Sequence, residues 1–439
     1  MINKRVFTVA IAALFVFSAL VAFIPANESE GADPEWTPVA AVMEAGDAFY
    51  SITEPGNLIW MQSQTLLTGT QFKLMNDIDA SERKFPASIT GATDFIHILD
   101  GNGFSIIGLN IENSENRTGL FRSLGERGIV ENLTIKDPTI LSTKNEVGAI
   151  AGNSMGIIRN CAVVGGSVTG DSSVGGIVGQ LNKGSVTECY NTSTVNGGTN
   201  YTGGIIGSNY SKTAVTNCFN AGAVSGAALV AGIVGFNYNA GDVMYCYNSG
   251  TISGTNPTAG MISGIVGNNF FTEGNTGTIS NVYNIGTING QRQTDICGNN
   301  NSGGTIESAY WLAVTANDKG GRTAVQMSGI GAFSEMPGFD RLVWKTMDNV
   351  GEQYYAPQLI LFTTGVSDQT IAISLESVKI TSSGSEGGSQ EGSGGSDDPG
   401  SSGGDNPDDG GDDTLLYVGI AAVAVVAVIG LLWFFVLKP

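Results

Sequence analysis

The amino-acid sequence predicts an all-β fold, a parallel β-helix in which short strands stack coil upon coil. Three observations predict it. A unit of about 28 residues repeats through the middle of the chain, each unit contains short β-branched runs separated by Gly and Asn, and no stretch has a 3.6-residue apolar period long enough for a helix. One unit is too short to bury a core by itself. Successive units must therefore stack in parallel register.

Each repeat consists of a glycine-rich box followed by a β-branched segment that ends in Asn or Cys. The closing glycines of the boxes are 27, 28, 28 and 32 residues apart. Partial copies flank the repeats, at residues 118–133 and 295–310. The five pairs of box and segment are Val147–Gly152 with Ile158–Cys161, Val174–Gly179 with Val186–Asn191, Thr202–Gly207 with Val215–Asn220, Ala231–Gly235 with Val243–Asn248, and Ser263–Gly267 with Ile279–Asn284.

Stacked coils place equivalent residues in ladders about 4.8 Å apart. The first ladder contains four cysteines and is flanked by Leu133, Val282 and Ala309, so it is predicted to point inward. Buried free thiols are the favoured interpretation, and disulfides between coils or a metal site are the alternatives. The cysteines are Cys161, Cys189, Cys218 and Cys246.

A second ladder contains Asn191, Asn220, Asn248 and Asn284. Stacked amides can donate hydrogen bonds from one coil to the next, and Asn also tolerates the left-handed backbone of a corner. The glycines at positions 176, 204, 232 and 264 predict either a corner or a close approach of two backbones.

The third ladder is aromatic and gives the candidate binding residues, Tyr190, Phe219, Tyr247 and Tyr283. As an exposed stripe these rings would stack on sugar rings. As a buried stripe they would stack on one another and stabilise the coils. Loops whose length varies between coils form a second candidate surface, at residues 196–201, 237–240 and 268–275.

Composition excludes several functions. The formal net charge is −20, which argues against nucleic-acid binding, and the single His excludes a site that needs two imidazoles. The densest acidic cluster, with His97 inside it, is predicted to cap turns, with calcium binding and catalysis as weaker alternatives. It contains Asp77, Asp79, Asp94 and Asp100. The sequence therefore predicts no catalytic residue, no metal, no cofactor and no enzyme activity.

The two ends of the chain predict a membrane-anchored protein. Residues 1–26 are predicted to be a signal peptide, with an uncleaved anchor as the alternative, and the uncharged run 415–437 a transmembrane helix. The charges beside these runs place the body outside and the C-terminus in the cytoplasm. Between them we expect a lead-in (27–65), the β-helix (66–312), a C-terminal cap (313–363), a strand or connector (364–380) and a disordered acidic stalk (381–414).

The boxes, together with segments 72–79 and 95–111 and the closing motifs Trp344–Lys345 and Pro357–Leu359, resemble surface proteins with GLUG-motif repeats. The resemblance covers roughly residues 66–362. It implies a right-handed parallel β-helix on secreted or surface-anchored prokaryotic proteins, often adhesin-like. Some such proteins also carry a metallopeptidase domain, but this chain has no HExxH motif. An adhesin that binds extracellular glycans or partner surfaces is the favoured function. A structural envelope protein is the alternative, and a polysaccharide-processing enzyme a minor one.

Overall fold

The computed structural model describes residues 34–86, 94–210, 212–239, 241–256, 260–272, 277–301, 304–346, 354 and 356–360. They belong to one compact unit, and a second unit begins at Glu386, beyond them. The predicted signal peptide, connector, stalk and membrane span lie outside the described residues. Within these ranges, no helix has the length and apolar character needed to cross a bilayer.

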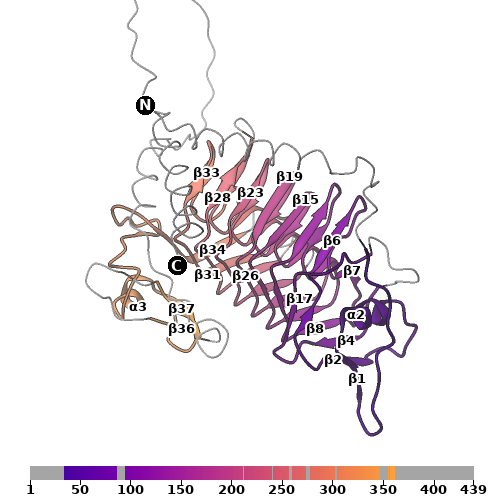
Figure 1. Ribbon diagram of the computed structural model, residues 1–439. Helices are drawn as coiled ribbons and strands as arrows, with labels where there is room; N and C mark the ends of the chain where they lie inside the picture. The colour runs from indigo at the N-terminus through magenta and orange to yellow at the C-terminus, as the bar shows by residue number, and fades with distance from the viewer. Residues whose placement is uncertain are drawn as a thin grey trace, which may run out of the picture. The chain divides into compact units, whose positions relative to one another are not determined.

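The described chain is a parallel β-solenoid, as predicted (Figure 1). Each coil contributes a strand to every side, and that strand pairs in parallel with its counterpart one coil later. One side is formed by β2 (Gln71–Leu74), β4 (Ile98–Asp100), β8 (Ile129–Glu131), β13 (Ile157–Arg159), β17 (Ser185–Thr187), β21 (Ala214–Thr216), β26 (Asp242–Met244), β31 (Thr278–Asn284) and β34 (Thr305–Leu312). The next is formed by β3 (Ile78–Asp79), β5 (Ser105–Ile107), β9 (Thr134–Lys136), β14 (Ala162–Val164), β18 (Tyr190–Asn191), β22 (Phe219–Asn220) and β27 (Tyr247–Asn248), and continues through β31 and β34 to β35 (Gly321–Arg322).

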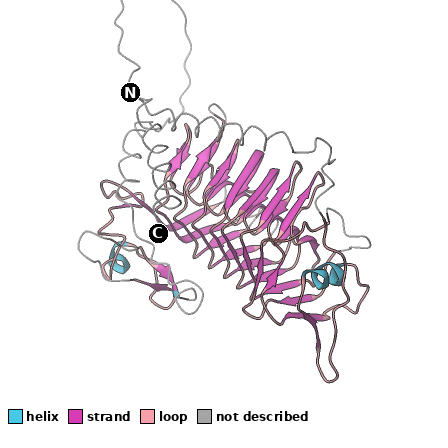
Figure 2. Ribbon diagram, viewed as in Figure 1, coloured by secondary structure: helices cyan, strands magenta, loops and turns pink. Residues whose placement is uncertain are grey.

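Two further sheets close each coil (Figure 2). The larger contains β6 (Asn110–Asn113), β10 (Thr139–Ser142), β11 (Val147–Gly148), β15 (Ser167–Gly175), β19 (Thr194–Gly203), β23 (Val224–Gly226), β24 (Leu229–Ala231), β28 (Ile252–Gly254), β29 (Met261–Ser263), β32 (Ile288–Asn289) and β33 (Gln293–Thr294). The six-stranded sheet contains β7 (Phe121–Leu124), β12 (Ala151–Ser154), β16 (Val178–Leu181), β20 (Ile206–Tyr210), β25 (Val234–Tyr238) and β30 (Val266–Phe270).

The core is a set of β-branched ladders inside the coils. Val186 of β17 pairs with Ile158 of the coil before and Val215 of the coil after, and all three are fully buried. Burial of each such side chain contributes about 1.5–3 kcal/mol, and its stiff χ1 suits an extended strand. Side chains alternate in and out along a strand, so the flanking residues Ser185 and Thr187 remain partly exposed.

The left-handed corner of each coil lies elsewhere than the asparagine ladder, which corrects one prediction. The corner residue precedes the cysteine position, three residues before the ladder asparagine: Glu188 has φ 56° and Asn217 has φ 54°. The corner recurs at Asn132, Asn160, Tyr245, Asn281 and Ser308. The ladder asparagines point into the core instead. The glycines at 176, 204, 232 and 264 serve close approach, because a Cβ on Gly204 would lie 2.2 Å from the carbonyl oxygen of Gly232.

The ends of the solenoid carry the few remaining elements. At the N-terminal end, β1 (Phe49–Ile52) pairs with β2, and α2 (Pro55–Gln62) follows. After β35 come α3 (Ala332–Glu335) and the antiparallel pair β36 (Trp344–Lys345) and β37 (Gln358–Leu359). We predicted that this last segment caps the open end. In the structure its aromatic residues pack beside the last coils, against the aromatic ladder.

Candidate ligand-binding surface

The predicted aromatic ladder is buried. Its rings are stacked with interplanar angles of 1° and centroids 4.8–4.9 Å apart. Between 0% and 5% of each residue is exposed, for Tyr190, Phe219, Tyr247 and Tyr283. Of the two interpretations, the structure supports stacking between coils, since rings buried in this way present no face to a sugar.

The C-terminal segment covers two of these rings directly. Trp344 lies 6.0 Å from Tyr247 and 5.6 Å from Tyr283, centroid to centroid, and Phe339 stacks on Trp344 at 4.6 Å. The Tyr283 hydroxyl donates to the carbonyl oxygen of Pro357. Burial raises the pKa of the Tyr247 and Tyr283 hydroxyls well above their ordinary value. The ladder and its cover therefore form one packed cluster.

The asparagine ladder is a buried chain of amides. Asn191 Nδ2 donates to Asn220 Oδ1 at 2.9 Å, Asn220 to Asn248 at 2.8 Å, and Asn248 to Asn284 at 2.8 Å. The second proton of each amide goes to the backbone carbonyl two residues later, as in Asn220 to Gly222 at 2.8 Å. At the first rung, Asn191 Oδ1 accepts from the amide nitrogen and the hydroxyl of Ser193. The amides are thus fully paired inside the core.

A second amide ladder runs through the six-stranded sheet, and the sequence analysis missed it. Asn209 donates to Asn237 at 2.8 Å, Asn237 to Asn269 at 2.7 Å, and Asn269 to Asn300 at 2.8 Å. The signal was present, because each of the first three follows a glycine box by two residues. Asn is so frequent in this chain that the ladder did not stand out from the polar surface.

The four ladder cysteines are free and buried. Each thiol lies near a backbone carbonyl of the preceding coil, as in Cys218 Sγ to the Val186 oxygen at 3.6 Å. Burial raises the pKa of the Cys189 and Cys246 thiols well above the ordinary value, so they stay protonated and unreactive. The fifth, Cys297, is half-buried, and burial raises its pKa to about 12.

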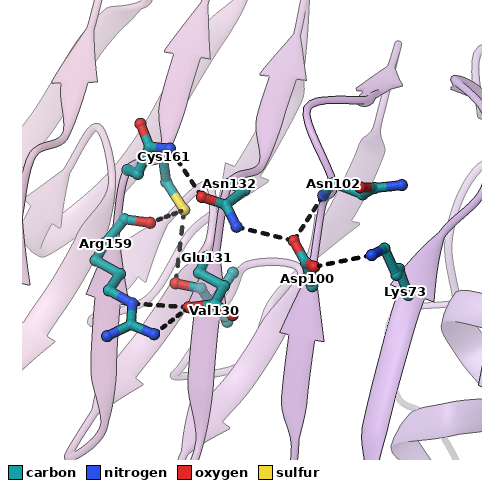
Figure 3. A network of polar contacts seen from close by, with 9 residues as sticks. Lys73, Asp100, Asn102, Val130, Glu131, Asn132, Arg159 and Cys161 are labelled. Carbon is teal, nitrogen blue, oxygen red and sulfur yellow. Dashed lines mark hydrogen bonds and ion pairs between the residues drawn. The ribbon is translucent and has the colours of Figure 1, made fainter. Parts of the chain in front are cut away.

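Carboxylates of the acidic cluster near His97 accept hydrogen bonds within turns and between strands. Asp77 accepts from the backbone nitrogen of Ser105 at 2.7 Å, and Asp79 from Ser81 at 3.0 Å. Asp100 accepts from Asn102 and Asn132 and pairs with Lys73 at 3.7 Å (Figure 3). In the described ranges, no three His, Cys, Asp or Glu side chains gather as a metal ion would require.

His97 is itself buried, with 4% of its surface exposed. Its ring lies edge-on to Phe72 and Phe95, at 5.8 and 5.4 Å. Burial lowers its pKa, and its Nδ1 atom has no hydrogen-bond partner in the structure. The side chain therefore faces the core.

A group of half-buried rings lies on the outer face of the six-stranded sheet, together with one ring from β19 of the neighbouring sheet. We call it the aromatic surface and define it as Tyr201, Tyr210, Phe236, Tyr238 and Phe270. All five are half-buried. Because Asn237 points into the core, its strand neighbours Phe236 and Tyr238 point outward. The register of β20, β25 and β30 aligns Tyr210, Tyr238 and Phe270.

The rings of the aromatic surface contact one another. Tyr238 and Phe270 are parallel at 5.6 Å, and Tyr201 stacks on Phe236 at 4.7 Å. Tyr210 is tilted against both Phe236 and Tyr238, by 71° and 57°. Each loop of the second predicted surface supplies one ring, namely Tyr201, Tyr238 and Phe270. The parts of those loops at 240 and 273–275 lie outside the described residues.

Polar groups border this surface on its N-terminal side. Glu146 and Tyr201 both have left-handed backbones, with φ 62° and 53°. Glu146 accepts from Arg117 at 3.0 Å and from Asn153 at 3.2 Å. Burial, and then the nearby Tyr201 and Glu146, raise the pKa of the Tyr210 hydroxyl. That hydroxyl is therefore a hydrogen-bond donor at neutral pH.

Comparison with known proteins identifies the repeats. The family model of the GLUG motif matches residues 170–196 and 226–253. Each match covers one coil, from the strand before or at a glycine box to the strand after a ladder asparagine. This chain carries GLUG-motif repeats. The resemblance inferred from the sequence is thereby confirmed.

Two curated relatives share part of the chain. Halomucin of Haloquadratum walsbyi is 33% identical over 139 residues, which is 29% of this chain and 2% of that protein. The "Putative Gly-rich membrane protein" of Evansella cellulosilytica is 34% identical over 104 residues, 22% of this chain and 12% of that protein. The chain therefore spans only a small part of the length of either relative.

A solved structure supports the fold. The crystal structure of a "putative immunoglobulin A1 protease" from Bacteroides ovatus superposes with a TM-score of 0.50, over 71% of this chain and 92% of that one. The two are 19% identical, so the likeness concerns the fold alone. Solenoids of one architecture carry unrelated functions, and function must be argued from the surface.

Proposed function

We propose that this protein is a membrane-anchored, adhesin-like cell-surface protein, whose solenoid binds extracellular glycans or the surfaces of partner molecules. The observation that carries the proposal is the aromatic surface. Five half-buried rings contact one another on one face of the solenoid. Contiguous apolar surface of this kind often marks a binding site.

Three further features support the proposal. The apolar runs 1–26 and 415–437 are those of a secretory signal and a membrane anchor, and one relative is named a membrane protein. The acidic linker 381–414 would hold the body away from the bilayer. Net charge −20 keeps such a body soluble and apart from other acidic surfaces.

A direct test has two parts. Intact cells that express the full chain are treated with protease, and we expect the solenoid to be released while a tag after Pro439 stays protected. The full-length chain is then screened on arrays of glycans and extracellular proteins. Specific binding is the expected result. A protected solenoid, or a released solenoid that binds no component of either array, would contradict the proposal.

A structural envelope protein without a ligand is the second candidate. The burial of the predicted aromatic ladder favours it, because those rings serve packing alone. We also propose that the chain is not an enzyme, since the acids near its only His cap turns. An envelope role predicts weakened cells when the gene is deleted, with no loss of attachment.

A further inference from the structure

We infer that the aromatic surface binds a neutral polysaccharide built of pyranose rings. Sugar C–H faces would pack on Tyr201, Phe236, Tyr238 and Phe270, and neighbouring amides would pair with the sugar hydroxyls. This inference rests on the proposed function and names both its ligand class and its site. The ladder of buried rings plays no part in it.

The first step is the electrical neutrality of the surface. Between Tyr201 and Thr272, the described residues include two charged side chains, Lys212 and Asp242. The Asp242 carboxylate already accepts from the backbone nitrogen of Thr278 at 2.9 Å. An acidic polysaccharide would find no cluster of cations here and would be repelled by the net charge of the chain. A neutral ligand fits both conditions.

The second step is the chemistry of the rings. Pyranose rings have apolar C–H faces and polar edges, so they pack well on aromatic side chains that are half exposed. Rings from three successive coils form one continuous surface, with centroid separations of 4.7–5.6 Å between Tyr201 and Phe236, Tyr210 and Tyr238, and Tyr238 and Phe270. The surface extends along the solenoid, which suits a chain of sugars.

The third step is the supply of hydrogen-bonding groups beside the rings. Asn268 pairs in register with Phe236, and its Oδ1 atom is a buried acceptor without a donor. A buried acceptor without a donor is costly, so it would gain from a hydroxyl placed against it. On the other flank, Gln180 and Asn182 are partly exposed and contact each other at 3.1 Å. Tyr210 adds a hydroxyl that stays protonated.

The experiment measures binding of the full-length chain, in mild detergent, to soluble polysaccharides by affinity electrophoresis. A neutral glucan, a xylan and a galactomannan are compared with polygalacturonate and heparin. We expect retardation by at least one neutral polymer and none by the acidic ones. Retardation by acidic polymers alone would overturn the inference and leave the proposed adhesin function intact.

The double variant Tyr238→Ala with Phe270→Ala locates the site. Loss of two stacking rings should weaken binding roughly tenfold or more. The matched control is Phe49→Ala with Phe333→Ala, which also removes two half-buried rings, far along the chain from this sheet. It should leave affinity unchanged. Equal affinity in the wild type and the Tyr238/Phe270 variant would overturn the inference.

A second measurement avoids substitutions. Hydroxyl-radical footprinting of the wild-type chain should show that the bound neutral polymer protects Tyr201, Tyr238 and Phe270, and leaves Phe49 unprotected. Protection elsewhere, with none on the aromatic surface, would contradict the inference even if a variant failed to fold. If the chain bound a protein on the extracellular-protein array and no polysaccharide, the proposed ligand class would be refuted and the proposed adhesin function would stand. No binding at all would refute the proposed function as well.

Discussion

The coils before and after residue 184 solve the same packing problem in different ways. In the earlier coils the ladder position that later holds Asn carries Ile106, Ile135 and Val163. From Asn191 to Asn284 it carries Asn, and in the last coil Trp311 takes the position. The ring position changes as well, from Ser105, Thr134 and Ala162 to Tyr190 and its successors.

Charge follows the same division. In the part of the chain that the structure describes, ion pairs lie between residues 73 and 183. Four of them join neighbouring coils, as in Arg117 to Glu146 at 3.0 Å and Arg159 to Glu131, the latter visible in Figure 3. Later coils are held by amides and rings instead.

The difference has a physical cause. Near-identical coils stacked in register place like beside like, about 4.8 Å apart, and like charges at that distance repel. Only side chains that pair with their own kind can form long ladders, and these are amides, rings and aliphatic groups. Coils that differ from one another can instead place opposite charges side by side. The four predictions below test this account, in order of expected effect.

Tyr247→Ala should have the largest effect, because it gives a late coil the small side chain of Ala162. The ring is 2% exposed and contacts Phe219, Tyr283 and Trp344. Truncation of a buried aromatic residue costs about 3–5 kcal/mol. We expect a lower urea midpoint and faster proteolysis of residues 313–360. Tyr238→Ala, which removes a half-buried ring, is the control. Similar losses in both variants would refute the packing role.

Asn220→Val should follow, since it interrupts an amide ladder in its middle. Asn191 loses its acceptor and Asn248 loses its donor. Two buried unpaired groups cost about 2–4 kcal/mol together. The reciprocal change, Val163→Asn, breaks no existing amide–amide hydrogen bond and should cost less. Chemical denaturation compares the two. A greater loss in Val163→Asn would show that ladder continuity is not what stabilises the later coils.

The third prediction concerns Asp295. The glycines at 176, 204, 232 and 264 pack against the ladder asparagines, and Asp295 takes the next position in that column. It follows Gly264 in register, and burial raises its pKa from 3.8 to about 6. A raised pKa in the folded state means that stability is fully present below about pH 3.8 and is lost as pH rises through about 6. Asp295→Asn should therefore stabilise the protein at pH 7.5, by about 1–2 kcal/mol since the side chain is partly solvated, and have little effect at pH 3.5. Thermal melts of the wild type and the variant at both pH values measure the effect. Equal shifts in melting temperature at the two pH values would contradict a raised pKa of Asp295.

The smallest effect concerns charge beside Arg159. Thr187 is its register partner in the next coil and is uncharged. Thr187→Glu places an acid beside the guanidinium, whereas Thr187→Lys places a second cation there. We expect the Glu variant to be the more stable by about 0.5–1 kcal/mol at low salt, with the difference lost in 1 M NaCl. A difference in stability that persists at high salt would indicate that strand propensity, and not charge, separates the two variants.

Much of the fold was predictable because the repeat is local in sequence. Glycine boxes, the cysteine ladder and the asparagine ladder follow from counting along the chain, and the structure confirms the parallel stacking. The right-handed sense of the coil stays a prediction. The left-handed corner was misplaced because its residue varies, from Asn160 to Glu188 to Tyr245, and so leaves no repeated letter.

The candidate site was less predictable. A period reveals which residues share a ladder, but not what packs outside it. Tyr190 and Tyr238 occur in similar strings, Cys-Tyr-Asn and Phe-Asn-Tyr, yet one ring is covered and the other faces solvent. The sequence offered the more regular ladder as its candidate binding stripe, with stacking between coils as the alternative, and regularity is a mark of packing.

The sequence by itself determined the coil length, the identity of the ladders and the scarcity of charge in the later coils, because each can be read along the chain. The tertiary structure alone decided which aromatic column is buried. The described part of the C-terminal segment packs beside the solenoid and brings Trp344 onto Tyr247 and Tyr283. That contact joins residues about 60 to 100 positions apart, and no local pattern encodes such a distance. The column left uncovered is the one available to a ligand.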